Sequence, residues 1–161
     1  MIIDKEFAEL IPALTEDEYK GLEASIVADG CRDALVVWVE VLVDGHNRYR
    51  ICTAHNVPFQ TVEKDFADRD AVKLWMMRNQ LSRRNLNDFQ RIEIVRKCED
   101  AVKADAKKRQ GTRTDLLTYA ENYAQVEPEK KRATIELGVM AGVSASTYEH
   151  AVAILDKAPK W

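Results

Sequence analysis

The junction at Asp44-Gly45, where an apolar stretch meets a polar one, constrains the fold of this chain more than any other feature of its sequence. The preceding residues 34–43 are rich in valine, and β-branched side chains favour strands. They could form one bent strand or a tight hairpin, because no Asn-Gly or Gly-Gly pair marks a turn. The polar residues 47–55 predict a helix, and Asn56 suits its end. The chain must therefore pass from strand to helix at Gly45.

Helices are predicted before and after this junction. Residues 16–29 begin with a capping box of Thr15 and Glu18, and Gly30 suits the left-handed conformation that closes a helix. An extended segment is predicted over 57–62, followed by a helix over 70–81 that Asp68 or Asp70 would cap. A long helix is predicted from Asn87 to about Lys108, and a polar connection over 110–127 with a short helical piece around 116–123. Two further helices are predicted, from Pro128 to about Ala141 and from Ala145 to about Leu155.

The long helix rests on two local signals. Asn87 and Gln90 are spaced as a second capping box, which marks a helix start. Apolar side chains then recur at helical spacing and form one stripe: Phe89, Ile92, Val95, Cys98 and Val102. The sequence therefore predicts that this stripe, Phe89 and Cys98 included, packs into a core.

The order of these elements predicts an α+β chain in two parts. A small mixed sheet with helices is expected over residues 1–86, and an all-α region over 87–161. With 161 residues, of which 46% are hydrophobic, the chain can bury one good core or two small ones. No apolar run is long enough to span a membrane, and the acidic N-terminus does not resemble an export signal. We expect a cytoplasmic protein with reduced cysteines, since the three cysteines lack the spacing of a zinc site.

The charge of the chain is segregated along its length. The net charge is −3, yet residues 83–113 carry 10 lysines and arginines against 5 acidic residues. A basic segment is a common mark of nucleic-acid binding, although it is also a common solvated helix face.

The strand-to-helix junction is a candidate anion site. Free amides and the positive end of the helix dipole point out of a helix start, and Gly45 would let a phosphate approach the backbone. Arg48 could grip that phosphate with its planar guanidinium, and Arg50 lies close by in the sequence. An ordinary exposed helix start explains the same residues about equally well. A second polar cluster, residues 79–86, lies at the end of the predicted 70–81 helix. Taken alone, it is explained as a helix C-terminus whose cations interact favourably with the helix dipole.

Taken in order, these motifs resemble the N-terminal domain of the ParB/sulfiredoxin superfamily, also described as the ParB-like nuclease domain, over about residues 10–90. The motifs are the 15–30 helix, the valine-rich segment, Asp44-Gly45-His46-Asn47-Arg48-Tyr49-Arg50, Asn56-Val57-Pro58-Phe59, and Asn79-Gln80-Leu81-Ser82-Arg83-Arg84-Asn85-Leu86. The resemblance implies a nucleoside triphosphate, CTP or ATP with magnesium, held by its phosphates. The implied nucleotide-binding residues are Gly45, His46, Asn47, Arg48, Arg50, Asn79, Arg83 and Arg84.

Two departures from the family pattern concern catalysis. Asn79 stands where the family carries a metal-associated glutamate, and His46 stands where a glutamate usually follows the glycine. An amide is a poorer ligand for a hard cation than a carboxylate. Nucleotide hydrolysis is therefore expected to be weak or absent, and no catalytic residue is assigned. Sulfiredoxin chemistry is not expected either, because no cysteine directly follows Gly45.

The C-terminal helices match the spacing of a helix-turn-helix. Leu137 and Val139 would be apolar positions of the first helix, Gly138 would allow a close helix crossing, and Gly142 and Ser144 would form the turn and cap the second helix. The alternative is an ordinary helical hairpin. If the pair binds double-stranded DNA, the contacting residues would be Ser144, Ser146, Thr147, Glu149 and His150, with Lys107, Lys108 and Arg109 supplying charge.

Three functions remain open from the sequence. The first is a nucleoid-associated DNA-binding protein of partition or transcription-regulator type, with a homodimer as one assembly state. The second is a nucleotide-dependent enzyme or nuclease on the same fold, for which Asp44, His46, Asp65 and Asp68 are the nearest acid–base candidates. The third is a protein-interaction module. Because no evident dimerisation region follows the helix pair, we also expect that the sequence is a shortened form of a longer protein.

Overall fold

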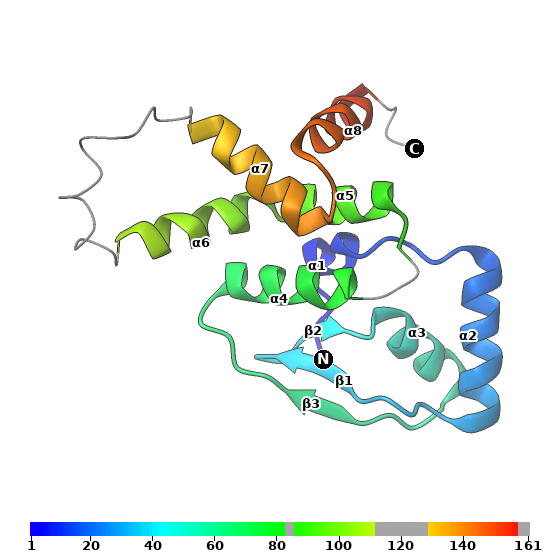
Figure 1. The fold of residues 1–161 in the computed structure, drawn as a ribbon. Helices are drawn as coiled ribbons and strands as arrows, with labels where there is room; N and C mark the ends of the chain where they lie inside the picture. Colours follow the sequence, from blue (N-terminus) through cyan, green and yellow to red (C-terminus); the bar gives the residue numbers. More distant parts are fainter. Residues whose placement is uncertain (83–85, 112–128, 158–161) are drawn as a thin grey trace, which may run out of the picture. The chain divides into compact units, whose positions relative to one another are not determined.

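A computed structural model describes residues 1–82, 86–111 and 129–157 (Figure 1). These residues form a three-stranded sheet and eight helices, which confirms the α+β class. The chain divides into two compact units, Met1–Met76 and Met77–Trp161, and each is described by itself. The sequence analysis placed the division at residue 86, between the predicted 70–81 helix and the helix from Asn87, whereas the two units meet after Met76. In the described residues, none of the helices is long and apolar enough to cross a membrane.

The valine-rich segment of the first unit is a tight hairpin. Strands β1 (Leu35–Trp38) and β2 (Val41–Asp44) pair antiparallel, and β3 (Thr61–Glu63) pairs parallel to β1 on its other side. The turn residues Val39 and Glu40 both have positive φ, of 47° and 67°. Two positive φ values are what a two-residue turn needs to match the twist of its strands. This resolves the alternative that the sequence left open, in favour of a hairpin.

The helices of the first unit largely follow the predicted bounds. Helices α2 (Glu16–Asp29), α3 (His46–His55) and α4 (Arg69–Leu81) lie where they were expected, and α2 has the predicted capping box. The short helix α1 (Lys5–Leu10) was not predicted. Asp4 caps it by accepting a hydrogen bond of 3.2 Å from the Phe7 amide.

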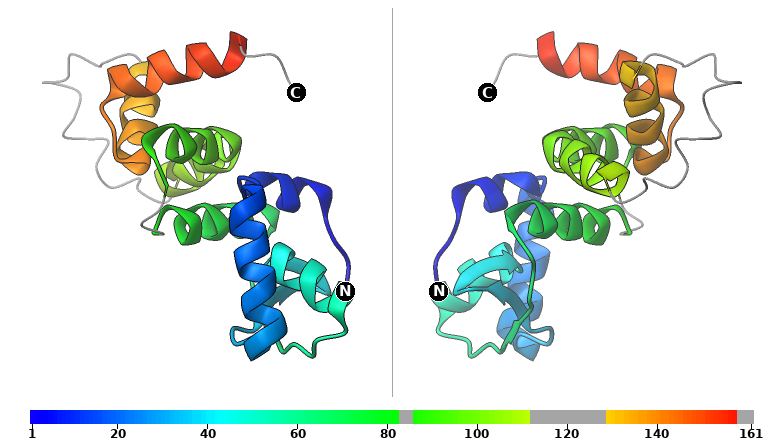
Figure 2. Two further views of the ribbon diagram at one scale, coloured as in Figure 1. Left: turned by 90° about the vertical axis from the view of Figure 1, so that its right-hand side faces the viewer. Right: turned by 90° about the vertical axis from the view of Figure 1, so that its left-hand side faces the viewer.

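The core of the first unit lies where the sheet and the helices meet. Leu35 and Leu42 of the hairpin, Phe7 of α1 and Val72 of α4 are fully buried. Helices α2 and α3 pack against each other (Figure 2), through Ile26 and Ile51. The hairpin and α3 thus hold the Gly45 junction from both sides.

The second unit contains a helix break that the sequence did not predict. The expected single helix over 88–108 is wrong: it is divided into α5 (Asp88–Lys97) and α6 (Glu99–Gly111). Cys98 between them has φ −101° and ψ 5°, outside helical values, and is buried. The acidic Glu99 and Asp100 then lie in the first turn of α6, where the helix dipole favours negative charge.

The apolar stripe is correct except at its first position. Ile92, Val95, Cys98 and Val102 are buried, but Phe89 is 41% exposed. Helices α7 (Glu129–Ala141) and α8 (Ala145–Lys157) complete the described part of the unit, and both pack on α5. The predicted connection overlaps α6, which extends to Gly111, and the rest of it, with Pro128, lies outside the described residues.

Candidate functional site

The Gly45 junction passes from strand to helix as the sequence predicts. The fold itself, however, explains why this residue is a glycine. Gly45 has φ 96° and precedes α3, whose Tyr49 amide donates a 2.8 Å hydrogen bond to the Gly45 carbonyl. A Cβ atom at this position would lie 2.5 Å from Leu35 Cδ2. Both the backbone conformation and the fully buried Leu35 therefore require glycine here, whether or not an anion binds.

Arg48 is held by groups of the protein itself. Its Nη2 lies 3.0 Å from Asp44 Oδ2, and its Nη1 donates to the carbonyl oxygens of Asp33 at 2.8 Å and Ala34 at 3.3 Å. The Arg48 side chain is 17% exposed and that of Asp44 is 12% exposed, so this is a mostly buried ion pair. The predicted phosphate-binding fork thus joins β2 and α3 to the loop before β1, and a phosphate would compete with Asp44 for it.

His46 is half-buried, and the nitrogen atoms of its ring lie in the buried part. Among the residues that the structure describes, neither of its ring nitrogens has a hydrogen-bond partner, and both are buried. Burial lowers the pKa of His46, while the carboxylates of Asp44 and Asp4 raise it. Burial has the larger effect, so the ring is held in its neutral form near neutral pH.

The other two residues of this predicted cluster differ in exposure. Asn47 is half-buried, whereas Arg50 is exposed and its guanidinium lies over the Tyr19 ring, 5.3 Å from the ring centroid. Arg50 is thus directed at α2, in a cation–π contact of modest strength. Gly45, His46, Asn47 and Arg48 are brought together at the start of α3, and Arg50 lies on the same helix.

The second part of the predicted nucleotide site belongs to the other unit. Asn79 is half-buried in the last turn of α4, where its carbonyl accepts a 2.7 Å hydrogen bond from the Ser82 hydroxyl. Arg83 and Arg84 lie outside the described residues. Since the chain divides after Met76, Gly45 and Asn79 fall in different units. Within the described residues, no group of three or more histidine, cysteine or acidic side chains could hold a metal ion.

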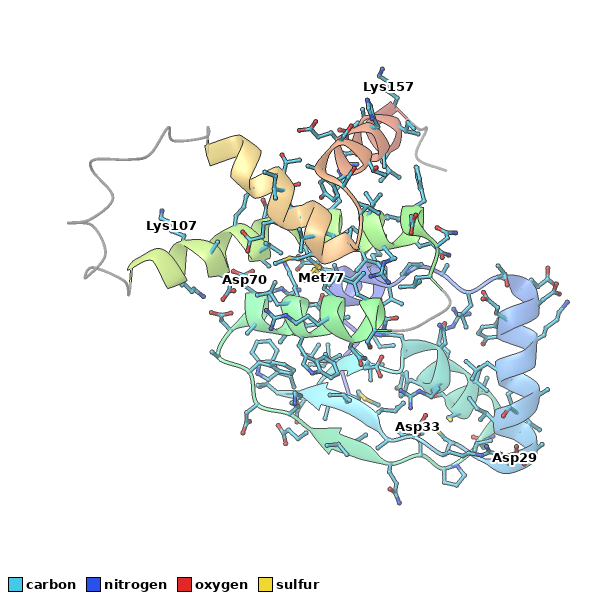
Figure 3. The ribbon with its side chains drawn as sticks, in the orientation of Figure 1. Asp29, Asp33, Asp70, Met77, Lys107 and Lys157 are labelled. Carbon is cyan, nitrogen blue, oxygen red and sulfur yellow. The ribbon has the colours of Figure 1, made fainter. Side chains whose placement is uncertain are left out.

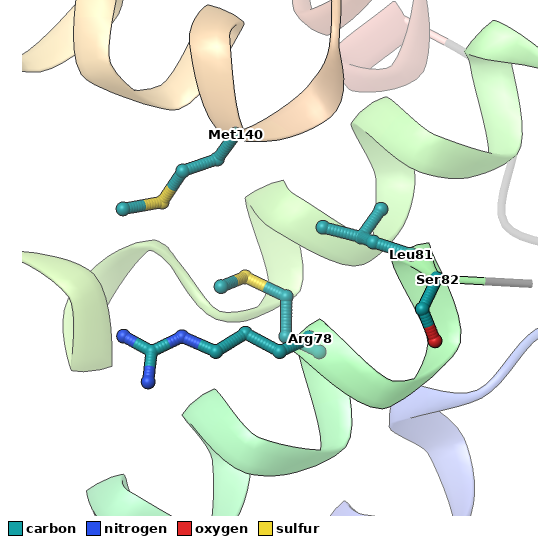
Figure 4. Close-up of a pocket in the computed structure, with 5 residues that line it drawn as sticks. Arg78, Leu81, Ser82 and Met140 are labelled. Carbon is teal, nitrogen blue, oxygen red and sulfur yellow. The ribbon is translucent and has the colours of Figure 1, made fainter.

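An open hollow of about 340 Å³ lies in the second unit (Figure 4). Arg78, Leu81 and Ser82 line it from the end of α4, together with Met77, and Met140 lines it from α7. Leu81 and Ser82 belong to the polar segment 79–86 of the sequence analysis, but the hollow itself was not predicted. The lining is mainly thioether and aliphatic carbon, which suits an apolar group better than a phosphate.

The C-terminal helix pair has the tight turn that the sequence predicts. Gly142 has φ 75° and follows α7, and the Val143 amide donates a 2.9 Å hydrogen bond to the Gly138 carbonyl. A Cβ atom on Gly138 would lie 3.1 Å from the Val143 oxygen, so both glycines are needed as expected. Ser144 caps α8 by accepting a 3.1 Å hydrogen bond from the Thr147 amide.

The helix pair has one buried face and one exposed face. Tyr148 and Ala151 of α8 are buried, as is Leu137 of α7. Val139, the second apolar position named for the first helix, is 72% exposed. The predicted DNA-contacting residues of α8 are all exposed: Ser144, Ser146, Thr147, Glu149 and His150.

Arg91 is a structural residue that sequence reasoning treated as a surface cation. Its Nε donates to the Ala141 carbonyl at 2.8 Å and its Nη1 to the Leu81 carbonyl at 3.1 Å. It therefore secures the last turns of α7 and α4 within the second unit. These two hydrogen bonds reveal the role, since nothing in the local sequence links Arg91 to Ala141.

The other cations of the basic segment that lie in the described residues are distributed along α5 and α6. Arg96 pairs with Asp156 of α8, and Lys103 with Glu99 at 2.7 Å. Lys107 and Lys108 are exposed near the end of α6 (Figure 3 labels Lys107). The side chain of Arg109 lies outside the described residues.

Comparison with known proteins identifies the fold. No protein-family model and no curated protein matches the chain. Two solved structures described as pNOB8-like ParB N-domains are similar to it, with TM-scores of 0.63 and 0.62 at 21% and 20% identity. The matches cover 98% and 96% of this chain, which spans 66% and 60% of those chains. The chain therefore has the fold of a ParB N-domain.

Proposed function

We propose that this chain is a ParB-like DNA-binding protein, of partition or transcription-regulator type, and that the α7–α8 pair contacts duplex DNA. The turn at Gly142 carries the proposal, because it is followed directly by a helix with an exposed polar start. In helix-turn-helix proteins the early residues of the second helix contact base edges in the major groove. The likeness to the ParB N-domain fold, over 98% and 96% of this chain, supports a partition-related protein.

The chemistry of α8 favours base reading over phosphate binding. Its exposed start carries hydroxyl groups, Glu149 and His150, but no lysine or arginine between Ser144 and Leu155. Hydroxyl groups can bond to either base or phosphate, and a carboxylate can accept a hydrogen bond from a cytosine amino group. Attraction to the phosphate backbone would come mainly from Lys107, Lys108 and Arg109.

Thr147 and His150 offer a direct test of base reading. The purified chain is titrated with a pool of random duplexes at low salt, and the bound sequences are determined for the native chain, Thr147→Ala and His150→Ala. Each variant should bind a different set of preferred sequences, at a cost of about 1–3 kcal/mol for each lost base contact. Light scattering of the complex shows whether one or two chains bind, since a dimer would read two half-sites.

A matched control is Ser25→Ala, an exposed position of α2 in the first unit. It should leave both affinity and preference unchanged. If the native chain retards no duplex at low salt, the helix pair is a packing element and the protein-interaction function becomes the better proposal.

We propose, second, that the start of α3 binds a nucleotide phosphate. The observation that favours it is local: Gly45 provides no side-chain cap for the amides at the start of α3, and His46 and Arg48 lie in the first turn of that helix. Binding would require Arg48 to exchange Asp44 for the phosphate. Magnesium with CTP or ATP is the ligand class that the resemblance implies.

Titration with CTP and ATP, each with and without magnesium, tests this second proposal. Arg48→Ala should abolish binding, whereas Arg32→Ala, which removes an exposed arginine paired with Asp29, should not. Retained binding by folded Arg48→Ala would refute it. Turnover should be weak in the native chain, and Asn79→Glu should raise magnesium-dependent hydrolysis if Asn79 takes part in the site.

A further inference from the structure

Two cysteines of the first unit are packed together. Cys31 directly follows Gly30, which ends α2, and Cys52 lies in the last two turns of α3. Cys52 is buried in a cluster with Ile26 and Ile51, and Cys31 packs against this cluster from its edge. Because α2 and α3 pack against each other, residues far apart in the sequence meet here.

Burial, Cys31 and Arg48 all influence the pKa of the Cys52 thiol. Burial raises the pKa of the Cys52 thiol, a hydrogen bond with the Cys31 thiol raises it further, and the charge of Arg48 lowers it in part. The Cys31 Sγ lies 3.5 Å from the Asp33 carbonyl oxygen as well. Cys31 is partly exposed while Cys52 is buried, so an oxidant in solution reaches Cys31 first.

We propose that Cys31 and Cys52 form a reversible disulfide, and that this pair is a redox modification site of the first unit. The two cysteines belong to one packed cluster, and a disulfide forms only between cysteines whose Cα atoms lie within about 7 Å of each other. The co-reactant is a low-molecular-weight disulfide such as oxidised glutathione. In a reducing compartment such bonds are transient and regulatory.

The reaction proceeds by two thiol–disulfide exchanges. The Cys31 thiolate, having lost its proton to water, attacks one sulfur of the small disulfide and expels one small thiolate. The Cys52 thiolate then attacks the Cys31 sulfur of this mixed disulfide and expels the second small thiolate. The protein loses two electrons and two protons, and the small disulfide is reduced to two thiols.

The bond would act on the surroundings of Arg48. The Asp33 carbonyl accepts hydrogen bonds from both Cys31 Sγ, at 3.5 Å, and Arg48 Nη1, at 2.8 Å. Oxidation removes the thiol hydrogen that Cys31 shares with this carbonyl. Cys52 lies one helical turn after Arg48 on α3, so the new bond joins the loop before β1 to the helix that carries the arginine. Figure 3 labels Asp29 and Asp33, which bracket this loop.

The experiment uses the full chain and oxidised glutathione, and it does not depend on DNA or nucleotide binding. After graded exposure the protein is alkylated, unfolded and mapped by mass spectrometry. Alkylatable thiols should fall from three per chain to one, with Cys98 remaining and the Cys31 and Cys52 peptides joined. Treatment with a reducing agent should restore all three.

Single substitutions identify the pair. Cys98→Ser, the matched control, should still form the linked peptide. Cys52→Ser should stop at a stable glutathione adduct on Cys31, and its fold is checked by circular dichroism. Three results with the native chain would overturn the proposal: an adduct that stays on Cys31 while Cys52 is free, a link to Cys98, or the retention of all its thiols. None of these results requires a variant to fold.

Discussion

Arg48 and Asp44 show how a residue singled out for ligand binding can also be structural. The pair is mostly buried, with 17% and 12% of the two side chains exposed. Arg48→Ala would remove the guanidinium that lies 3.0 Å from the buried Asp44 carboxylate. We expect a loss of about 3 kcal/mol in the free energy of unfolding, measured by urea denaturation.

The double variant Arg48→Ala/Asp44→Asn separates the ion pair from the packing of the side chain. It should recover part of that loss, because the buried charge is also removed. Equal urea midpoints for native chain and Arg48→Ala would show that Asp44 is solvated in solution. Nucleotide binding by Arg48 variants should therefore be measured under conditions in which these variants remain folded.

Tyr148 is a second residue whose environment gives a testable result. Its hydroxyl is buried and, within the described residues, has no hydrogen-bond partner, and burial with the charge of Glu99 raises its pKa to about 12. The unfolded chain ionises near the ordinary value of 10, so the native chain should lose stability between about pH 10 and 12.

Tyr148→Phe removes this ionisation together with the unpaired hydroxyl. At neutral pH its stability should equal or exceed that of the native chain by up to about 1 kcal/mol. Its alkaline loss of stability, followed by urea denaturation from pH 8.5 to 11, roughly the range in which tyrosine titrates, should be smaller. Tyr148→Ala, in contrast, should cost about 3–5 kcal/mol, as loss of a buried aromatic ring does. A large loss in Tyr148→Phe at neutral pH would mean that the hydroxyl has a partner in solution.

At the scale of elements, Arg91 joins the last turn of α7 to α4 and so supports the turn before α8. Arg91→Ala removes two hydrogen bonds to main-chain carbonyls, those of Ala141 and Leu81. The expected cost is about 1–3 kcal/mol in the free energy of unfolding. Amides of α8 should exchange with deuterium faster, because the turn loses its support.

Phe89→Ala is the matched control for Arg91→Ala on the same helix, since Phe89 is 41% exposed. It should leave deuterium exchange in α8 close to that of the native chain. If both variants increase exchange equally, Arg91 has no special part in holding the turn.

The elements that could be predicted from the sequence are those with local signals. The capping boxes of Thr15 with Glu18 and Asn87 with Gln90 fix two helix starts within one turn of chain, and both are present. The turn at Val39 and Glu40 could not be predicted, because a β-branched residue rarely adopts positive φ without support from its surroundings. The break at Cys98 likewise interrupts a regular apolar stripe with no glycine or proline to mark it.

The position of the candidate site could be predicted from the sequence, but the hydrogen-bond partners of its side chains could not. The strand end and the turn at Gly45 follow from sequence, but the contacts of Arg48 with the Asp33 and Ala34 carbonyls span 15 and 14 residues. Such contacts depend on how the hairpin packs on α3. The same holds for the neighbouring thiols of Cys31 and Cys52.

For the whole molecule, the distribution of charge predicts how DNA binding should depend on salt. The chain has a net charge of −3, so any attraction to DNA must come from a local basic surface, and Lys107 and Lys108 of α6 are exposed. Each phosphate that a cation neutralises contributes about 0.9 to the slope of log affinity against log salt. Lys107→Gln/Lys108→Gln should therefore flatten this slope by about 1–2 and weaken binding to all sequences alike.

The matched control removes charge from the first unit instead. Lys5→Gln changes a lysine whose side chain is 89% exposed on α1 and should leave the slope as it is in the native chain. The slopes are measured by fluorescence anisotropy with one labelled duplex over a series of salt concentrations. An equal flattening by Lys5→Gln would assign the attraction to overall charge. An unchanged slope in the α6 variant would remove α6 from the DNA interface while leaving the base-reading part of the proposal, on α8, to its own test.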